Sequence, residues 1–118
     1  MGEVRLTLEV GDVREERFET VEVLVDTGST YCQVPGSLLR RLGVPVRWET
    51  QVRLADSRII TDQIGQASIK LEGKTFVAPI AFGKEGEPNL LGLVALETAM
   101  LAVDPVQQRL VPTIGWKA

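Results

Sequence analysis

The most informative stretch of this chain is residues 23–30, Val-Leu-Val-Asp-Thr-Gly-Ser-Thr. Its alternating valines predict a buried strand that runs directly into Asp26. A carboxylate at such a position costs several kcal/mol to remove from water unless it is hydrogen-bonded or paired. Gly28 permits a tight turn whose backbone amides can point back at the carboxylate. Asp26 is therefore a candidate functional residue, although a plain strand-ending turn also explains the tripeptide Asp-Thr-Gly.

Strand-like segments surround this stretch on both sides. Residues 4–10 alternate between apolar and polar side chains, the period of two that a half-buried strand shows. Residues 44–54 and 59–64 are also strand-like, and the turn-forming residues Asp56 and Ser57 between them predict a hairpin with a polar tip. The other expected strands are residues 67–71, 75–82, 102–104 and 109–112.

Two short helices are expected between the strands. The first follows a Pro-Gly pair, with Ser37 as its candidate N-cap and Gly43 placed to end it. The second covers residues 95–101. Because strands with turn signals between them recur about every 8 to 12 residues, the sequence predicts an all-β barrel or sandwich with one or two short helices.

Length and composition bound the class of protein. The chain has 118 residues, enough for one domain, so we expect residues 1–118 to fold as a single unit. Hydrophobic residues make up 44% of the chain and charged residues 25%, as in a water-soluble globular protein. The net charge of −3 comes without a basic patch that could neutralise phosphates, which argues against nucleic acid as a partner.

The absence of histidine excludes several kinds of site. Without His the chain can form neither a Ser-His-Asp nor a Cys-His catalytic relay, nor a His-ligated metal site. Its single cysteine, Cys32, cannot form an internal disulfide and is interpreted as a buried packing thiol. No window approaches the ~20 apolar residues of a membrane-spanning helix, and no secretion signal is visible. We therefore expect a cytoplasmic protein without metal, cofactor or membrane partner.

Residues 23–30 resemble the active-site strand and loop of aspartic proteases, in which apolar residues precede Asp-Thr-Gly and a Ser or Ala follows. Leu90, Leu91 and Gly92 resemble the family's segment of two hydrophobic residues and a glycine, which crosses beneath that loop. The predicted hairpin lies between the two motifs, where the retropepsin-like, single-lobe branch carries its flap. The resemblance covers nearly the whole chain and implies a closed β-barrel, the acid protease fold.

The resemblance also implies how such a protein would work. An aspartic protease needs two such aspartates and this chain has one Asp-Thr-Gly, so a homodimer would place Asp26 of each subunit at a two-fold axis. The two carboxyl groups would share one proton and activate a water that hydrolyses a peptide bond, without a cofactor. Thr27 would bridge the two loops through its hydroxyl, the Gly28 amide would support the carboxylate, and Ser29 would bond its outer oxygen.

By the same resemblance, the hairpin tip would contact a peptide substrate. The tip consists of Ala55, Asp56, Ser57 and Arg58, and a solvated hairpin turn explains these residues equally well. Retroviral flaps are rich in glycine at the tip, whereas this one has none. A second function therefore stays open at this stage, a non-catalytic module of the same fold that binds a peptide or dimerises larger partners.

The chain ends are relevant to the dimer as well. Retroviral relatives interleave the ends of both chains into a shared sheet. Residues 113–118 are short and contain Gly115, so we expect this end to contribute less strand than its retroviral counterpart. Trp48 and Trp116 are expected in the core or at an interface.

Overall fold

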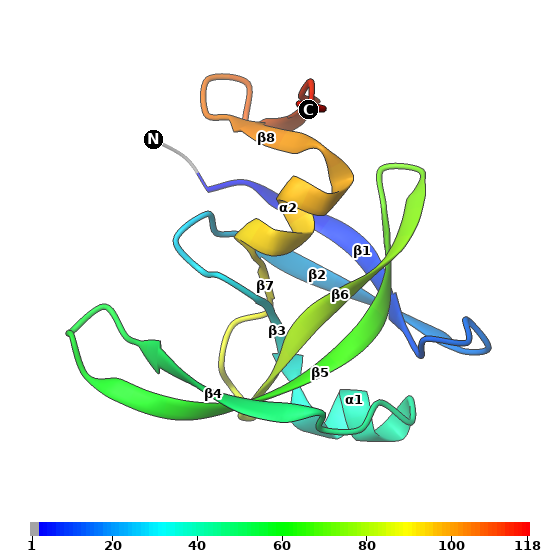
Figure 1. Ribbon diagram of the computed structural model, residues 1–118, viewed down its shortest axis with the longest axis vertical. Coiled ribbons are helices and arrows are strands. Elements are labelled where there is room, and N and C mark those ends of the chain that lie inside the picture. The colour runs from blue at the N-terminus through cyan, green and yellow to red at the C-terminus, as the bar shows by residue number, and fades with distance from the viewer. Residues whose placement is uncertain (1–2) are drawn as a thin grey trace.

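The computed structural model describes residues 3–118 as strands joined by short loops, with two short helices (Figure 1). The all-β class expected from the sequence is confirmed. The strands are β1 (Arg5–Gly11), β2 (Phe18–Val25), β3 (Cys32–Pro35), β4 (Trp48–Arg53), β5 (Ile59–Leu71), β6 (Lys74–Gly83), β7 (Leu90–Leu91), β8 (Leu101–Asp104) and β9 (Arg109–Pro112), and the helices are α1 (Gly36–Arg41) and α2 (Leu93–Ala99).

Seven of the strands form one sheet that closes on itself. Their order is β1-β2-β7-β3-β6-β5-β4. Strand β1 pairs with β5 as well as with β2, and this additional pairing closes the sheet into a ring. Strand β4 pairs with β5 alone and extends beyond this ring as a long hairpin. Strands β8 and β9 pair with each other as a separate two-stranded sheet that follows α2.

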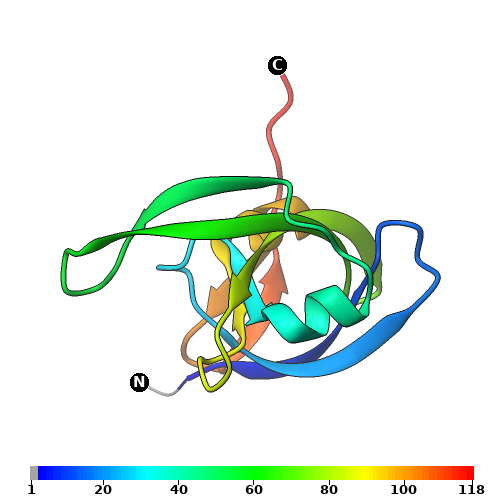
Figure 2. The ribbon, with the colours of Figure 1, turned by 90° about the horizontal axis from the view of Figure 1, so that it is seen from below.

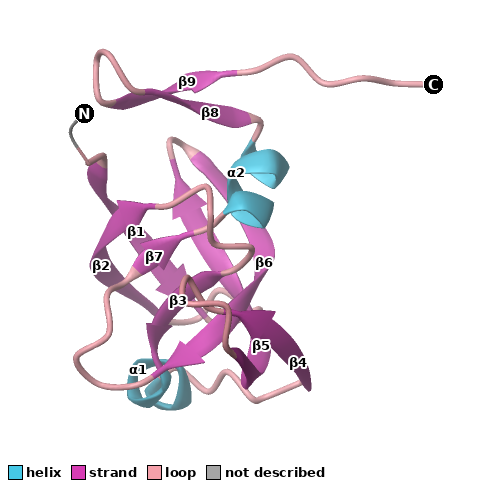
Figure 3. Ribbon diagram, turned by 90° about the vertical axis from the view of Figure 1, so that its left-hand side faces the viewer, coloured by secondary structure: helices cyan, strands magenta, loops and turns pink. Residues whose placement is uncertain are grey.

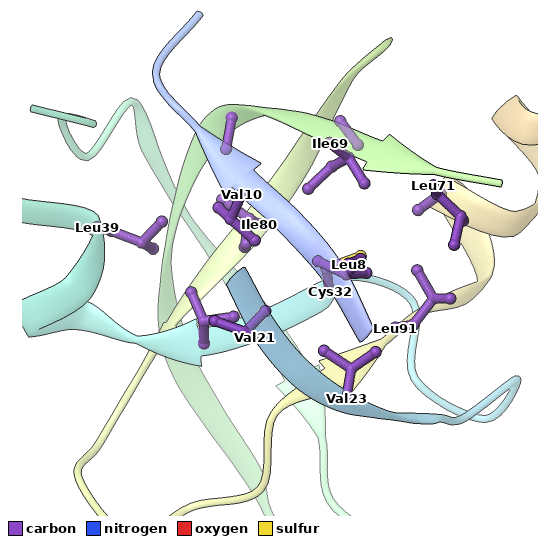
Figure 4. Packing of buried hydrophobic residues seen from close by; sticks show 14 of the residues in the cluster. Leu8, Val10, Val21, Val23, Cys32, Leu39, Ile69, Leu71, Ile80 and Leu91 are labelled. Atoms are coloured by element: carbon purple, nitrogen blue, oxygen red, sulfur yellow. The ribbon is translucent and has the colours of Figure 1, made fainter. Parts of the chain in front are cut away.

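The hydrophobic core fills the inside of the ring. Side chains from different strands point toward one another there, among them Val10, Ile69 and Ile80, all fully buried (Figure 4). Leu39 from α1 and Leu96 from α2 join the same cluster, so both helices pack on the ring through apolar side chains. Burial of a Val, Leu or Ile side chain contributes roughly 1.5–3 kcal/mol, which makes this cluster the main source of stability.

The predicted hairpin exists, but its bounds were partly wrong. The first strand starts at Trp48 rather than at residue 44, because Pro45 has no N–H for strand pairing and the chain crosses over β5 at this point. The second strand runs without a break from Ile59 to Leu71, through Gly65. A Cβ on Gly65 would lie 2.7 Å from the Pro45 carbonyl oxygen, so this glycine makes room for the crossing chain instead of ending the strand.

The helix boundaries also differ from expectation. Helix α1 begins at Gly36 after Pro35, and Ser37 is not its N-cap, because the Ser37 hydroxyl is hydrogen-bonded to the Glu85 carboxylate. Gly43 follows the end of α1 with a φ of +79°, as expected of a residue that stops a helix. Helix α2 starts two residues earlier than the sequence suggested. Among residues 3–118, no helix is long and apolar enough to cross a membrane.

Closure of the ring at β1 gives a stability prediction. Val10 is 0% exposed where β1 pairs with both neighbours, whereas Val77 on β6 is 47% exposed. We expect Val10→Ala to lower the free energy of unfolding by about 2 kcal/mol, from lost burial and a cavity. Val77→Ala makes the same chemical change and should stay within about 0.5 kcal/mol of wild type in urea denaturation. Equal losses of unfolding free energy in both variants would mean that the buried Val10 contributes no more to stability than the exposed Val77.

Candidate active site

Asp26 lies at the end of β2, where three hydrogen bonds fix its position. The Asp26 amide donates to the Leu91 carbonyl at 3.0 Å, which ties it to β7. The Gly28 amide donates to Asp26 Oδ1 at 2.9 Å, and the Ser29 amide donates to the Asp26 carbonyl at 3.1 Å. The carboxylate is half-buried, while Thr27 and Gly28 are exposed at the surface of the loop. The side chain is thus oriented by the backbone of its own loop.

One contact expected in this loop is absent and another replaces it. The Ser29 hydroxyl donates to the Tyr31 carbonyl at 2.8 Å and not to the outer carboxylate oxygen of Asp26. A serine hydroxyl has one proton to donate, so the turn that brings the Tyr31 carbonyl close takes that proton. Ser29 therefore shapes the turn in this structure, and the carboxylate is supported by the Gly28 amide.

Strand β7 passes directly beneath the loop. The Leu24 amide donates to the Asn89 carbonyl at 2.9 Å on one side, and Leu90 pairs with Gln33 of β3 on the other. Strand β7 therefore joins β2 to β3, the two strands that the loop connects, as Figure 3 shows. The segment of Leu90, Leu91 and Gly92 is thus bonded to both strands that flank the loop.

The loop and helix α2 share a tight junction at Gly92. A Cβ on Gly92 would lie 2.4 Å from the carbonyl carbon and oxygen of Tyr31, so a larger residue cannot fit without moving the loop. The next two amides, of Leu93 and Val94, donate to the carbonyls of Ser29 and Thr30 at 2.8 and 3.0 Å. These two carbonyls accept the hydrogen bonds of the first amides of α2, which have no partner within the helix, and so replace a side-chain cap. No sequence pattern signals a cap of this kind.

Cys32 follows the loop, and its thiol is buried in the core cluster. This burial raises the pKa of the thiol to about 11, although the Gly92 amide at 3.5 Å from Sγ acts in the opposite direction. The expected packing role of Cys32 agrees with this position, because a neutral buried thiol is a poor nucleophile. Within residues 3–118, no group of three or more Cys, Asp or Glu side chains is placed to hold a metal ion.

Asp26 belongs to the face of the sheet opposite the core cluster, a face that is buried at Ile64 and Ala81 and partly exposed elsewhere. Side chains alternate along β2, so Asp26 points to the same face as Leu24, two residues earlier, whereas Val23 and Leu91 point into the core. Directly paired residues share a face, and the pairings extend this face across the sheet. We call it the Asp26 face, and it includes Leu24, Leu90, Gln33, Ala81, Ile64 and Trp48.

The tip of the β4–β5 hairpin is a closed, internally bonded turn. Asp56 accepts hydrogen bonds from the Arg58 amide at 3.0 Å and from Arg58 Nε at 2.6 Å, and these bonds lower the pKa of Asp56. Arg53 donates to the Ser57 carbonyl at 3.1 Å. Ser57 has a φ of +72°, so it adopts the left-handed conformation that glycine would otherwise supply.

The hairpin extends past the Asp26 loop as a long arm, as Figure 2 shows. Ala55 and the other three tip residues are exposed. Among the described residues no hydrogen bond joins the tip to the Asp26 loop, so the structure of one chain does not bring these two predicted parts of a site into contact.

Comparisons with known proteins agree with this geometry. A family model described as aspartyl protease matches residues 6–94. The EIAV protease in complex with the inhibitor HBY-793 is similar in structure, with a TM-score of 0.59 and 16% identity over 83% of this chain and 88% of that one. The protease of simian foamy virus (mac) is also similar in structure, with a TM-score of 0.54 and 15% identity over 80% of this chain and 96% of that one. A search of curated proteins gives no match. At such identities the structural similarity shows a shared fold.

The Gly92 junction can be tested by adding one methyl group. We expect Gly92→Ala to lower the free energy of unfolding by at least about 1–3 kcal/mol, because the new Cβ would overlap the Tyr31 backbone. Leu93→Ala is the matched control, since Leu93 is exposed at the adjacent position and should cost much less. Chemical denaturation measures both. A Gly92→Ala protein as stable as wild type would show that loop and helix are not in tight contact.

Proposed function

The chain belongs to the aspartyl protease family, whose model matches most of its length, and from this premise we propose that it is a homodimeric aspartic endopeptidase. The observation that carries the proposal is the Asp26 carboxylate, held at 2.9 Å by the Gly28 amide on a loop supported by β7. One chain supplies one such carboxylate, and the adjoining Thr27 and Gly28 are exposed. A second copy of the loop would meet this surface across a two-fold axis.

The chemistry follows from bringing two carboxyl groups together. Two carboxylates within about 3 Å of each other cannot both ionise, so the pair holds one proton. The ionised Asp26 takes a proton from a water as the water oxygen bonds to the substrate carbonyl carbon, and the protonated Asp26 gives its proton to the carbonyl oxygen. The Asp26 that took the proton of water then gives it to the amine nitrogen, the other Asp26 takes a proton from one hydroxyl of the tetrahedral intermediate, and the C–N bond breaks to give the amine and the carboxylic acid.

The neighbouring residues would position this pair. The Thr27 hydroxyl is exposed and would bridge to the partner loop, while the Gly28 amide keeps Asp26 Oδ1 in place. Leu90 and Leu91 form strand β7, which pairs with β2 and would support the loop from below. The hairpin with its tip at Ala55–Arg58 would cover a peptide bound between the two chains.

A second function has one observation in its favour. The hairpin tip contains no glycine, and Asp56 and Arg58 hold it in one conformation. Such a tip would suit a non-catalytic module that binds a peptide without covering it. An intact Asp-Thr-Gly favours the peptidase, because a binding module gains nothing from two carboxylates that repel each other.

Replacing Asp26 distinguishes the peptidase from the non-catalytic binding module. We expect Asp26→Asn to reduce peptide cleavage by at least about 10²- to 10⁴-fold, since the amide cannot act as acid or base. The fold should stay as stable as wild type or become more stable, because Asn can accept the Gly28 hydrogen bond and the repulsion between carboxylates is lost.

The measurement pairs a cleavage assay with a thermal melt of the same samples, and Glu49→Gln on the hairpin serves as a charge-matched control. Cleavage by Asp26→Asn at the wild-type rate would refute the mechanism. Absence of cleavage by both proteins, with a change only in the melt, would favour the binding module.

The C-terminal tail is the expected source of dimer contacts. The C-terminal end of the chain extends away from β9 (Figure 3), and its large apolar residues are exposed, Ile114 to 95% and Trp116 fully. Of the two places expected for Trp116, the core of its own chain is therefore excluded, and burial against a partner chain remains the proposal. The tail has no strand after Pro112, consistent with a smaller strand contribution than in retroviral relatives.

Deleting residues 114–118 tests this interface. We expect the dimer to dissociate at a protein concentration at least about tenfold higher than for wild type, because two large apolar side chains per chain lose their burial. Deletion of residues 117–118 alone keeps Ile114 and Trp116 and should have little effect. Sedimentation over a dilution series gives the dissociation constants. Equal constants for all three proteins would place the interface elsewhere.

A further inference from the structure

One carboxylate lies on the part of the hairpin that continues the Asp26 face. Trp48 pairs with Ile64 on this face, and the next pairs on the same face are Thr50 with Asp62 and Val52 with Ile60. Thr50, Val52 and Asp62 are half-buried on this face, where Trp48 and Ile60 are 39% exposed. Every hairpin residue that points to the other face is exposed. Those exposed residues are Glu49, Gln51, Arg53, Ile59, Thr61 and Gln63. The more sheltered face of the hairpin is thus mainly apolar, with Asp62 as its charged member.

Asp62 lacks a cationic partner. Its Oδ1 accepts a hydrogen bond from the adjacent Gln63 amide at 3.1 Å, and none of the ion pairs among residues 3–118 includes it. Burial raises the pKa of Asp62, and the negative charge of Glu87 acts in the same direction. Both effects raise the free energy of the ionised carboxylate, and a cation beside it would lower that free energy.

The nearby cations of the chain line a cavity that Asp62 shares. This cavity of about 590 Å³ is lined by the carboxylates Glu49 and Glu85 as well as by Arg40 and Lys84. Neither cation forms an ion pair with Asp62, and the Arg40 guanidinium carbon lies 5.7 Å from the centroid of the Phe82 ring. The position beside Asp62 is therefore open to a cation brought by another molecule.

We propose that Asp62 is a specificity-determining residue that selects a lysine or arginine side chain in the peptide substrate. The proposal rests on the proposed function, because it concerns a peptide lying along the Asp26 face beneath the hairpin. Val52 and Ile60 offer apolar surface for the methylene stem of such a side chain, and Asp62 accepts hydrogen bonds from its charged end. A glutamate at the same place would be repelled by Asp62 and Glu87.

Two-fold symmetry makes the selection more specific. A homodimer presents one Asp62 under each hairpin, on opposite sides of the two Asp26 side chains. An extended peptide would meet the two copies at places related by the axis. Basic residues should therefore be favoured at two positions, one on each side of the cleaved bond.

The test uses peptides that differ at one residue. Cleavage of a mixed peptide library by wild type locates the two positions, and matched peptides carrying Lys, Gln or Glu there are then compared by kcat/KM. We expect wild type to prefer Lys over Gln by about 10- to 100-fold, in line with a hydrogen bond between charged groups in a sheltered site. Asp62→Asn should reduce this preference to less than about threefold and still cleave the Gln peptide.

Two further variants keep the result interpretable. Glu97→Gln removes the same charge from helix α2, which does not line this cavity, and should keep the Lys preference. Asp62→Lys should reverse the order and favour the Glu peptide. A wild-type protein without preference for Lys, or an Asp62→Asn protein that retains the preference, would overturn the proposal.

Binding distinguishes this inference from the proposed function. Here Lys or Gln is placed at each position of one peptide in turn, so that no cleavage is needed to choose the position. The Asp26→Asn protein should bind one or two of the Lys peptides more tightly than the matching Gln peptides by fluorescence anisotropy, and adding Asp62→Asn should remove the difference. If wild type cleaves no peptide but this difference is found, the peptidase proposal fails and the role of Asp62 stands. If binding also ignores the substituted residue, the role of Asp62 is wrong whether or not peptides are cleaved.

Discussion

The insertion of β7 between β2 and β3 is the constraint on which the rest of the structure depends. The Asp26 amide donates to the Leu91 carbonyl, so the loop that carries the carboxylate is bonded to a segment from the far end of the chain. Gly92 then passes too close to Tyr31 for any side chain, and the carbonyls of Ser29 and Thr30 start α2. Two motifs distant in sequence thus become one rigid unit.

The sequence predicted the features that depend on local chemistry and missed those that depend on contact between distant segments. Alternation located most of the strands but missed β3, and Gly43 ended α1 as a left-handed residue should. The sequence predicted two strands at residues 59–64 and 67–71, whereas the structure has one, in which Gly65 lets the Pro45 carbonyl pass. The Ser29 hydroxyl could have bonded either of two oxygens, and only the turn geometry selects the Tyr31 carbonyl.

The two faces of the sheet differ in burial and in charge. One face points into the ring and holds side chains such as Val23, Ile80 and Leu91, which are almost completely buried. The Asp26 face is half-buried at Leu24, Leu90 and Gln33 and also carries Asp62 at the hairpin. A carboxylate can lie on this second face because its desolvation is partial and the apolar core offsets the cost. A residue shift of one in β2 would put Asp26 into the core, so the register fixes the site as firmly as the loop does.

Hydrogen bonds within the hairpin tip leave the base of the hairpin as the place where it can bend. Asp56, Arg58 and Arg53 bond the tip to itself, so the turn keeps its shape without a bound peptide. An exposed ion pair adds little stability, but these bonds remove the freedom that a glycine-rich tip would have. Residues 59–63 of β5 pair with β4 and residues 65–71 pair with β6, while Ile64 pairs with both. Bending is therefore easiest at the base of the hairpin, where the pairing partner of β5 changes, and the hairpin would move as one arm that carries Asp62 with it.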